Sequence, residues 1–349
     1  MSRFRKGLIA VATLVAVTMA TSQQTTASSS WSFTDDSTNL GLTGVSPHVE
    51  RTGSVDRLWY SGGPGGTAVA DCTCSGSCTA VAANWGSPIN DVTFATFGGV
   101  KRAYFKKMDP MSGTQAVYSA PCLTADCVSI GAATLTSEQM KVSSSVRAWG
   151  VPDAVELPGG AGIRIYIVES PTMSSSCPEK VASYTSTDGV SFVKDAGYRF
   201  SKDGYVDTEI LRATTGSWLM IMSDGPGCGN TQELYMSDST DGLTWSNPVA
   251  ITGSDKSRLD PTGYETSPGS NVFKVYFATS GGRQDMNFTI GSGTLKVAAA
   301  SSSTAATTAA KAKIGATCTK AGAKASITIS KKKTTLTCKT VKKKLVWSK

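Results

Sequence analysis

The chain has one histidine, His48, among its 349 residues, and this scarcity excludes several kinds of site. A single imidazole rules out a histidine-rich metal centre and any mechanism that needs two histidines. No glycine-rich phosphate loop is indicated, because GGPGG at 62–66 follows a strand pattern and precedes no helical one. Gly291, Ser292 and Gly293 form G-S-G rather than G-x-S-x-G, so a serine-hydrolase elbow is not indicated. No metal site is predicted.

Long runs with 3.6-residue periodicity are also missing, and strand patterns take their place. Apolar and polar residues alternate at 57–60 and 164–167, as is typical of strands. STDGVSF at 186–192 and STDGLTW at 239–245 are two copies of one motif, 53 residues apart. In each copy the Asp side chain can accept bonds from nearby backbone N–H groups and the Gly can take positive φ. The motif therefore predicts a tight turn in a repeated β-unit.

Five segments share one design, with a polar start, a turn and then an apolar strand carrying an aromatic residue near its end. They start at residues 45, 89, 151, 205 and 259, so the intervals are 44, 62, 54 and 54 residues. Such spacing fits blades of four short strands joined by loops of unequal length. The sequence predicts an all-β fold, a five-bladed β-propeller over residues 31–297.

These repeats resemble the five-bladed β-propeller glycosidases, and the twin turn motifs resemble the Asp boxes of sialidases. The resemblance covers roughly residues 31–300 and depends on the repeat architecture. It implies that the innermost strand of each blade begins near a central cavity where a sugar would bind. It also implies that the Asp boxes lie on the opposite, outer side and are structural.

Carboxylates gather where the five inner strands begin. Aligning the segment starts gives one column: Pro47, Asp91, Asp153, Asp207 and Asp260. Glycoside hydrolysis needs a carboxylic acid that protonates the leaving oxygen and a carboxylate that acts as base or nucleophile, and clustered acids raise at least one pKa. Asp153, Asp207 and Asp260 are therefore the leading catalytic candidates. Glu209 is the best placed nearby glutamate, because strand residues two apart share a face.

Two alternatives stand beside catalysis. Asp at a strand start can cap a turn or hold the neighbouring blade, and a propeller without turnover could bind a polysaccharide in the same cavity. The glycosidase resemblance implies Asp on the first blade, Asp on the second and a Glu acid on the third. The first blade here offers Ser46, Pro47 and His48 instead. Sialidase chemistry would need three arginines that grip a carboxylate, and nothing selects three here.

Five residues are candidates for substrate contact, because they belong to the column or lie beside the starts of inner strands. They are Asp91, His48, Trp149, Arg258 and Tyr264. An aromatic face at Trp149 or Tyr264 could stack on a pyranose ring. The axial carboxylates could hold Ca²⁺, but no spacing specifies it, so no cofactor is predicted.

The amino terminus predicts export. Arg3, Arg5 and Lys6 precede a thirteen-residue apolar stretch, and small residues near Ala20 or Ala27 suit cleavage by signal peptidase. Residues 1–27 are predicted to be a signal peptide, because the apolar stretch is too short for a membrane span. The mature protein is expected to be secreted or held at the cell surface, and to be a monomer.

Nine cysteines in an exported chain are disulfide candidates. Proximity in the sequence pairs Cys122 with Cys127 and Cys318 with Cys338. Cys177 and Cys228 occupy comparable offsets in adjacent units and could join two loops. The cluster at 72–78, with cysteines at 72, 74 and 78, would then keep the odd thiol, and its spacing favours a loop bridge over a metal site.

Composition changes abruptly after Val297. Residues 298–310 form an Ala/Ser/Thr linker, and 311–349 hold twelve lysines and no acidic residue. The region between signal and linker has 19 basic and 26 acidic residues, so the overall charge of +8 averages two opposite regions. The last 39 residues predict a small hairpin unit stapled by two cysteines, similar to modules at the ends of exported actinobacterial proteins. Its charge favours anionic wall polymers as partners, and nucleic acid is not predicted.

Overall fold

The computed structural model describes residues 30–62, 66–73, 76–109, 111, 113–142, 150–170, 177–282, 285–298, 324–329, 332–341 and 344–348. The predicted signal peptide, nearly all of the predicted linker, and Cys74, Trp149 and Cys318 lie outside them. Within these residues, no helix has the length and apolar character to cross a membrane.

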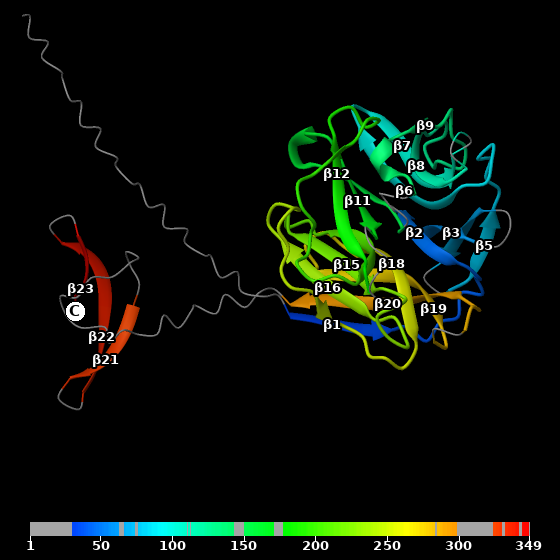
Figure 1. The fold of residues 1–349 in the computed structure, drawn as a ribbon. Helices are drawn as coiled ribbons and strands as arrows, with labels where there is room; N and C mark the ends of the chain where they lie inside the picture. Colours follow the sequence, from blue (N-terminus) through cyan, green and yellow to red (C-terminus); the bar gives the residue numbers. More distant parts are fainter. Residues whose placement is uncertain are drawn as a thin grey trace, which may run out of the picture.

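Five four-stranded antiparallel sheets make up the body of the chain, confirming the predicted propeller (Figure 1). The first contains β2 Val45–Thr52, β3 Val55–Ser61, β4 Thr67–Thr73 and β5 Cys78–Val81. The second contains β6 Asn90–Phe97, β7 Val100–Met108, β8 Gln115–Pro121 and β9 Thr134–Leu135. The third contains β10 Asp153–Glu156, β11 Ile163–Glu169, β12 Lys180–Ser186 and β13 Val193–Lys194.

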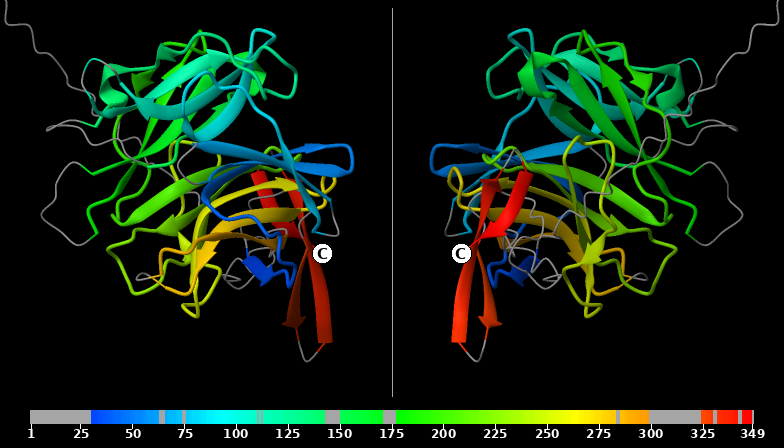
Figure 2. Two further views of the ribbon diagram at one scale, coloured as in Figure 1. Left: turned by 90° about the vertical axis from the view of Figure 1, so that its right-hand side faces the viewer. Right: turned by 90° about the vertical axis from the view of Figure 1, so that its left-hand side faces the viewer.

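The fourth sheet contains β14 Tyr205–Arg212, β15 Trp218–Asp224, β16 Leu234–Ser239 and β17 Val249–Ala250. The fifth contains β18 Ser257–Glu265, β19 Val272–Ser280, β20 Thr289–Ala298 and β1 Ser30–Asp35. Two short 3₁₀ turns, Glu138–Met140 and Pro158–Gly160, complete the regular structure. Figure 2 shows the sheets from two opposite sides.

The fifth blade takes its outer strand from the other end of the chain. β1 pairs antiparallel with β20 in a register that sets Phe33 opposite Leu295, and Figure 1 shows the two strands side by side. This pairing closes the ring, because the first and last strands of the propeller then share one sheet. The repeat pattern did not reveal it, since β1 precedes the first predicted unit.

The core consists of five separate hydrophobic clusters, and each lies between two neighbouring blades. The second and third blades meet around Tyr104, Ile165 and Tyr184, which are fully buried. The third and fourth meet around Tyr166 and Trp218. Successive residues of each strand point to opposite faces of the sheet. Each blade therefore buries apolar side chains on both faces and is held by two neighbours.

The two repeated turns have the predicted geometry. The Asp188 carboxylate accepts hydrogen bonds from the N–H groups of Val190 (2.7 Å) and Ser191 (2.8 Å). These bonds lower the pKa of Asp188 to about 2. Gly189 takes φ 72°, which favours glycine, and its carbonyl accepts a bond from the Tyr104 hydroxyl at 2.8 Å. Each turn thus ties one blade to the next and carries no reactive group.

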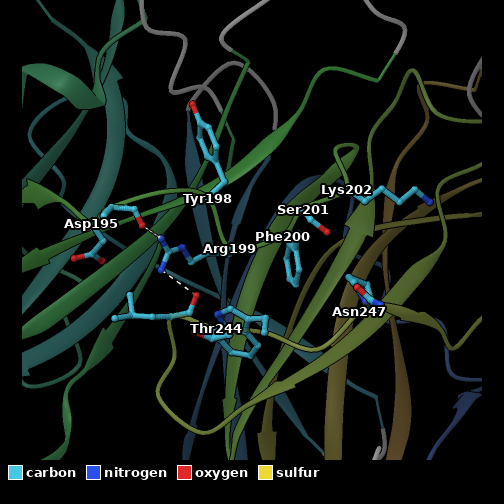
Figure 3. A pocket seen from close by; sticks show the side chains of 12 residues that line it. Asp195, Tyr198, Arg199, Phe200, Ser201, Lys202, Thr244 and Asn247 are labelled. Carbon is cyan, nitrogen blue, oxygen red and sulfur yellow. Dashed lines mark hydrogen bonds between the residues drawn. The ribbon is translucent and has the colours of Figure 1, made fainter. Parts of the chain in front are cut away.

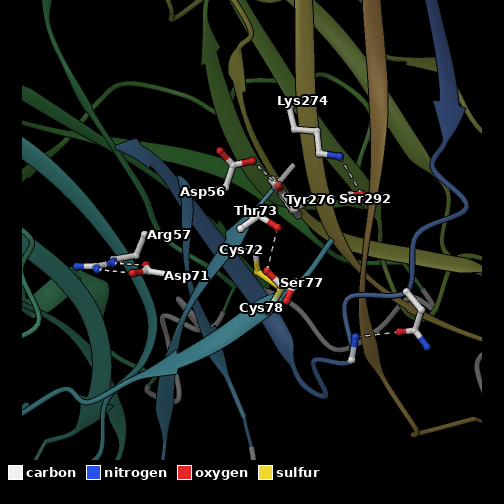
Figure 4. Close-up of a disulfide and its surroundings, with 12 residues drawn as sticks. Asp56, Arg57, Asp71, Cys72, Thr73, Ser77, Cys78, Lys274, Tyr276 and Ser292 are labelled. Atoms are coloured by element: carbon white, nitrogen blue, oxygen red, sulfur yellow. Dashed lines mark hydrogen bonds and ion pairs between the residues drawn. A yellow bond between two sulfur atoms is a disulfide. The ribbon is translucent and has the colours of Figure 1, made fainter. Parts of the chain in front are cut away.

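Three disulfides are formed among the described residues. Cys122 bonds to Cys127 and Cys177 to Cys228, as predicted from proximity and repeat offset. In the cluster at 72–78, Cys72 pairs with Cys78 and joins β4 to β5 (Figure 4). The Cys177–Cys228 bridge links a loop of the third blade to a loop of the fourth.

The carboxy-terminal module is a three-stranded antiparallel sheet, one strand more than the predicted hairpin. It contains β21 Lys324–Ile329, β22 Lys332–Val341 and β23 Lys344–Ser348. Cys338 on β22 is buried and disulfide-bonded, and Trp347 of β23 lies opposite it.

Candidate functional site

The inner strands of four blades share a strained residue near their starts. Ser46, Asp91, Asp207 and Asp260 all have φ between 51° and 53°, a left-handed conformation that is uncommon outside glycine. At each of these positions the pairing with the next strand skips, as in a β-bulge. Bulges re-aim side chains, and here they direct one residue per blade toward the axis.

A second ring of side chains comes from the same inner strands, two residues after the bulged positions. His48, Thr93, Asp153, Glu209 and Thr262 each pair with the middle residue of the neighbouring strand, respectively Trp59, Tyr104, Tyr166, Ile221 and Tyr276. We call these five residues the inner ring. The cavity ring consists of the residues two positions earlier, which all line one cavity: Ser46, Asp91, Val151, Asp207 and Asp260.

The single column predicted from the sequence was therefore wrong in two blades. Ser46, rather than Pro47, stands beside Asp91, Asp207 and Asp260, and the third blade contributes Val151 to that level. Asp153 pairs with Tyr166 and belongs to the inner ring with Glu209. The error arose because the five strand starts were aligned by their Asp residues. A bulge adds one residue to a strand, and no sequence signal marked which strands contain one.

The cavity ring lines a hollow of about 380 Å³ at the axis. Asp91 forms an ion pair with Lys106 at 2.8 Å and accepts a hydrogen bond from Ser61 Oγ at 3.2 Å. Asp207 accepts a bond from Ser223 Oγ at 3.0 Å. Asp260 Oδ2 accepts bonds from Ser46 N at 2.8 Å and Ser46 Oγ at 3.3 Å. The rest of the wall includes the apolar residues Val45, Leu259, Met286 and Phe288.

Two carboxyls of this cavity interact with each other. Asp207 and Asp260 are buried and hydrogen-bonded to each other. Burial raises the pKa of both, and the nearby charges of Asp207 and Asp91 raise the pKa of Asp260 well above its usual range. The cavity thus holds a carboxyl with a strongly raised pKa, Asp260, together with an ion-paired carboxylate, Asp91.

The inner ring has a different partner set, since its side chains accept bonds from the next blade's backbone. Thr93 Oγ1 accepts from Ala154 N at 3.2 Å, and Asp153 Oδ2 accepts from Ile210 N at 2.8 Å. Thr262 Oγ1 accepts from Val49 N at 3.2 Å, and Glu209 accepts from the Gly263 N–H. In the fifth interface His48 instead packs edge-on against Phe94, 5.4 Å between ring centres.

Burial shifts the pKa values of the acids and the histidine of the inner ring in opposite directions, upward for Asp153 and Glu209 and downward for His48. Burial raises the pKa of Asp153, and burial together with the Asp153 charge raises the pKa of Glu209 well above its usual range. Burial and the charge of Lys101 lower the pKa of His48 to about 3. Because His48 is neutral at pH 7, the approach of its Nδ1 to Glu209 Oε1, 3.9 Å, is not a salt bridge.

Two predicted contact residues are engaged away from the cavity. Arg258 forms ion pairs with Asp35 on β1 and with Asp255. The Tyr264 hydroxyl donates to Asp56 at 2.7 Å and receives a bond from Arg51 at 2.6 Å. Arg258 thus joins parts of the fifth blade, Tyr264 joins the fifth blade to the first, and neither lines the cavity. The Trp149 prediction falls outside the described residues.

The sequence interpretation missed Ser46, Lys106 and Ser223. Lys106 and Ser223 stand two residues beyond Tyr104 and Ile221 on the second strands of their blades. Aligning those second strands by their middle residue, as was done for the first strands, would have placed both at the level of the cavity ring. The aromatic residue Tyr104 was the available signal for Lys106, whereas the fourth blade has Ile221 at that position and offers no aromatic signal for Ser223.

The described residues contain one grouping of three possible metal donors, Cys177, Glu179 and Cys228. Both sulfurs belong to a disulfide, so neither is a thiolate that could bind a metal.

Comparisons with known proteins identify the fold. No protein-family model matches the sequence, and no curated protein matches it. Solved structures do match in shape. The GH43 endo-arabinanase from Bacillus licheniformis has 11% identity and a TM-score of 0.52, covering 74% of this chain and 95% of that one.

An endo-arabinase from Bacteroides thetaiotaomicron has 10% identity and a TM-score of 0.53, covering 74% of this chain and 96% of that one. A thermostable family-43 glycoside hydrolase has 13% identity and a TM-score of 0.50, covering 75% and 91%. The protein is therefore a five-bladed propeller whose structural neighbours include GH43 glycoside hydrolases. Identities this low establish the fold alone.

Proposed function

We propose that this protein hydrolyses glycosidic bonds of a polysaccharide in the axial cavity. The supporting observation is the hydrogen-bonded pair Asp207–Asp260 beside the ion-paired Asp91. Hydrolysis of a glycoside needs one protonated and one ionised carboxyl group at the same bond. The fold shared with glycoside hydrolases is consistent with the proposal.

In this mechanism Asp260 is the general acid and protonates the leaving oxygen. Asp207 is its positioning partner, because a second buried carboxyl keeps the Asp260 proton in place. Asp91 is the base that activates water, and it forms an ion pair with Lys106 at 2.8 Å. The apolar wall around Met286 and Phe288 offers surface to the sugar ring.

A panel of aryl glycosides and polysaccharides, including arabinan and xylan, would test the activity. On a turned-over substrate, Asp91→Asn and Asp207→Asn should each lower kcat/KM by about 100-fold or more. Asp126→Asn is a matched control, since Asp126 lies on the surface and pairs with Arg57. Turnover that is equal in wild type and both cavity variants would overturn the assignment.

A second function is a propeller that binds a glycan without cleaving it. It is favoured by the first blade, where Ser46 stands at a position that three other blades fill with Asp. Both the N–H and the hydroxyl of Ser46 bond to Asp260, the proposed acid. Polysaccharide retention in affinity electrophoresis, with no product from any glycan of the panel, would support this function over hydrolysis.

We also propose that the chain is exported and that its lysine-rich module binds anionic polymers of a cell wall. Three disulfides are in keeping with an oxidising compartment, and the twelve lysines at 311–349 give the attraction. Deletion of 311–349 should weaken association with isolated cell walls at low salt. Equal retention with and without the module would reject the proposal.

A further inference from the structure

A second cavity lies away from the axis, between the third and fourth blades. Its volume is about 480 Å³, and none of its lining residues belongs to the axial cavity. Its walls are two segments, residues 195–202 after β13 and residues 243–248 of the second repeated turn. Figure 3 shows Phe200, Ser201 and Lys202 on one segment facing Thr244 and Asn247 on the other.

The walls combine aromatic surface with polar groups. Phe200 and Trp245 are half-buried, and each packs edge-on against a tyrosine, Tyr205 and Tyr166 respectively. Those tyrosines fix the ring positions. Ser201 and Asn247 are exposed beside the rings and can exchange hydrogen bonds with a ligand. Flat apolar faces bordered by hydrogen-bonding side chains suit a pyranose ring.

Two cationic side chains of this cavity, Arg199 and Lys202, form no ion pair with a carboxylate among the described residues, although the charges of Asp195 and Asp241 act on Arg199 from a longer distance. Arg199 is 5% exposed, and its Nη atoms donate only to the carbonyl oxygens of Ala196, Gly197 and Leu243. Its buried Nε has no hydrogen-bond partner, and no ion pair joins Arg199 to a carboxylate in the described part of the chain. Burial lowers the pKa of Arg199, which marks an environment that disfavours its charge.

The one lining carboxylate does not balance that charge. Asp195 forms an ion pair with Arg164 at 3.3 Å and accepts bonds from Ser183 and Thr185. Lys202 is exposed at the other end of the wall, its ammonium 5.7 Å from the centre of the Tyr205 ring. A buried guanidinium and an exposed ammonium that form no close ion pair with a carboxylate in the described residues attract an anion at this surface.

We propose that this cavity is a second saccharide site, specific for sugars that carry a carboxylate. The pyranose face packs on Phe200 and Trp245, Lys202 pairs with the carboxylate, and Arg199 adds its field from within the wall. Saccharide as the ligand class depends on the proposed function, but the site itself requires no hydrolysis. The acidic axial cavity and this basic one would then favour different units of one polysaccharide.

Calorimetric titration with trigalacturonate tests the site, using the full chain with Asp260→Asn so that cleavage does not interfere. The fully methyl-esterified trisaccharide is the neutral probe, because it keeps the rings and removes the charge. We expect at least tenfold weaker binding of the ester. Lys202→Glu should weaken trigalacturonate binding at this site at least tenfold and remove its contribution from the isotherm.

Lys107→Glu is the matched control, since Lys107 also lies over a tyrosine ring, 4.5 Å from that of Tyr118, far from this cavity in the fold. It should leave the isotherm unchanged, which separates this site from general attraction by the lysine-rich module. Phe200→Ala should weaken both probes. Binding that is unaffected by Lys202→Glu and Phe200→Ala, or equal for acid and ester, would overturn the proposal. Because binding is measured without turnover, its failure is distinct from failure of the proposed hydrolysis.

Discussion

The cavity ring and the inner ring are two levels of one axis, built from the same strands with the same chemistry. Each holds a pair of buried carboxyls with raised pKa values, Asp207–Asp260 in the first and Asp153–Glu209 in the second. Their partners differ. The first pair lines a hollow and accepts one N–H bond from a neighbouring blade, Ser46 to Asp260, whereas the second lies outside the hollow and both its members accept N–H bonds, from Ile210 and Gly263 of the next blades.

This difference shows that a perturbed pKa at the axis does not by itself mark a reactive group. Burial raises the pKa of a carboxyl wherever it occurs, and structural networks also require burial. What separates the two levels is the backbone. The bulges at the cavity ring turn side chains into open space, while regular pairing at the inner ring turns them toward the neighbouring blade.

The largest expected effect is on activity, and it distinguishes the two rings directly. Asp260→Asn should lower kcat/KM by about 1000-fold, because the amide cannot protonate the leaving oxygen. Asp153→Asn should keep activity within about threefold, since the amide oxygen can still accept from Ile210 N. Steady-state kinetics on a substrate found in the panel measures both. Equal losses would mean that the rings act as one site.

The next largest effect is on stability, and it is expected for the inner ring rather than for the cavity ring. Asp153→Ala removes the acceptor of the buried Ile210 N–H, which should lower the free energy of unfolding by about 2 to 3 kcal/mol. Asp153→Asn serves as the control that keeps the acceptor. Urea denaturation followed by tryptophan fluorescence provides the measurement. An alanine variant as stable as wild type would show that the inter-blade bond contributes nothing.

Stability should also depend on pH through these acids. The folded pKa values are raised above the unfolded values of about 4, so the folded state binds more protons between the two. The contribution of these acids to the free energy of unfolding should therefore fall as pH rises from 5 to 8, by more than about 1 kcal/mol, whereas His48, whose folded pKa is lowered to about 3, contributes in the opposite sense. The double variant with Asp153→Asn and Glu209→Gln should make the slope of stability against pH more positive than in wild type. A slope that is unchanged would assign the dependence to other groups.

The smallest effect concerns a single hydroxyl of the inner ring. Thr262→Val should cost about 1 kcal/mol, because Val49 N and Glu209 Oε1 lose their partner. Thr262→Ser keeps the hydroxyl and should be closer to wild type. Thermal unfolding of the two variants, compared at one pH, gives the difference. Equal melting temperatures would indicate that the methyl group, rather than the hydroxyl, matters.

Much of the architecture follows from local sequence. The alternating strands, the twin turns and the five repeated starts specify the blades, because strand pairing and turn geometry depend on neighbouring residues. Cysteine spacing gave Cys122–Cys127, and equal repeat offsets gave Cys177–Cys228. The closure by β1 could not be foreseen, since its pairing with β20 joins the two ends of the propeller.

The residues of the candidate site also divide into those predicted from the sequence and those assigned only by the tertiary structure. Asp207, Asp260 and Asp91 were recognised as axial from sequence, because their offsets within the repeat are local facts. Only the tertiary structure assigned Asp153 and Glu209 to the inter-blade bonds, placed Lys106 on Asp91, and moved Arg258 and Tyr264 away from the cavity. The physical reason is that a bulge of one residue changes the direction of a side chain, and the partner it then meets comes from another blade.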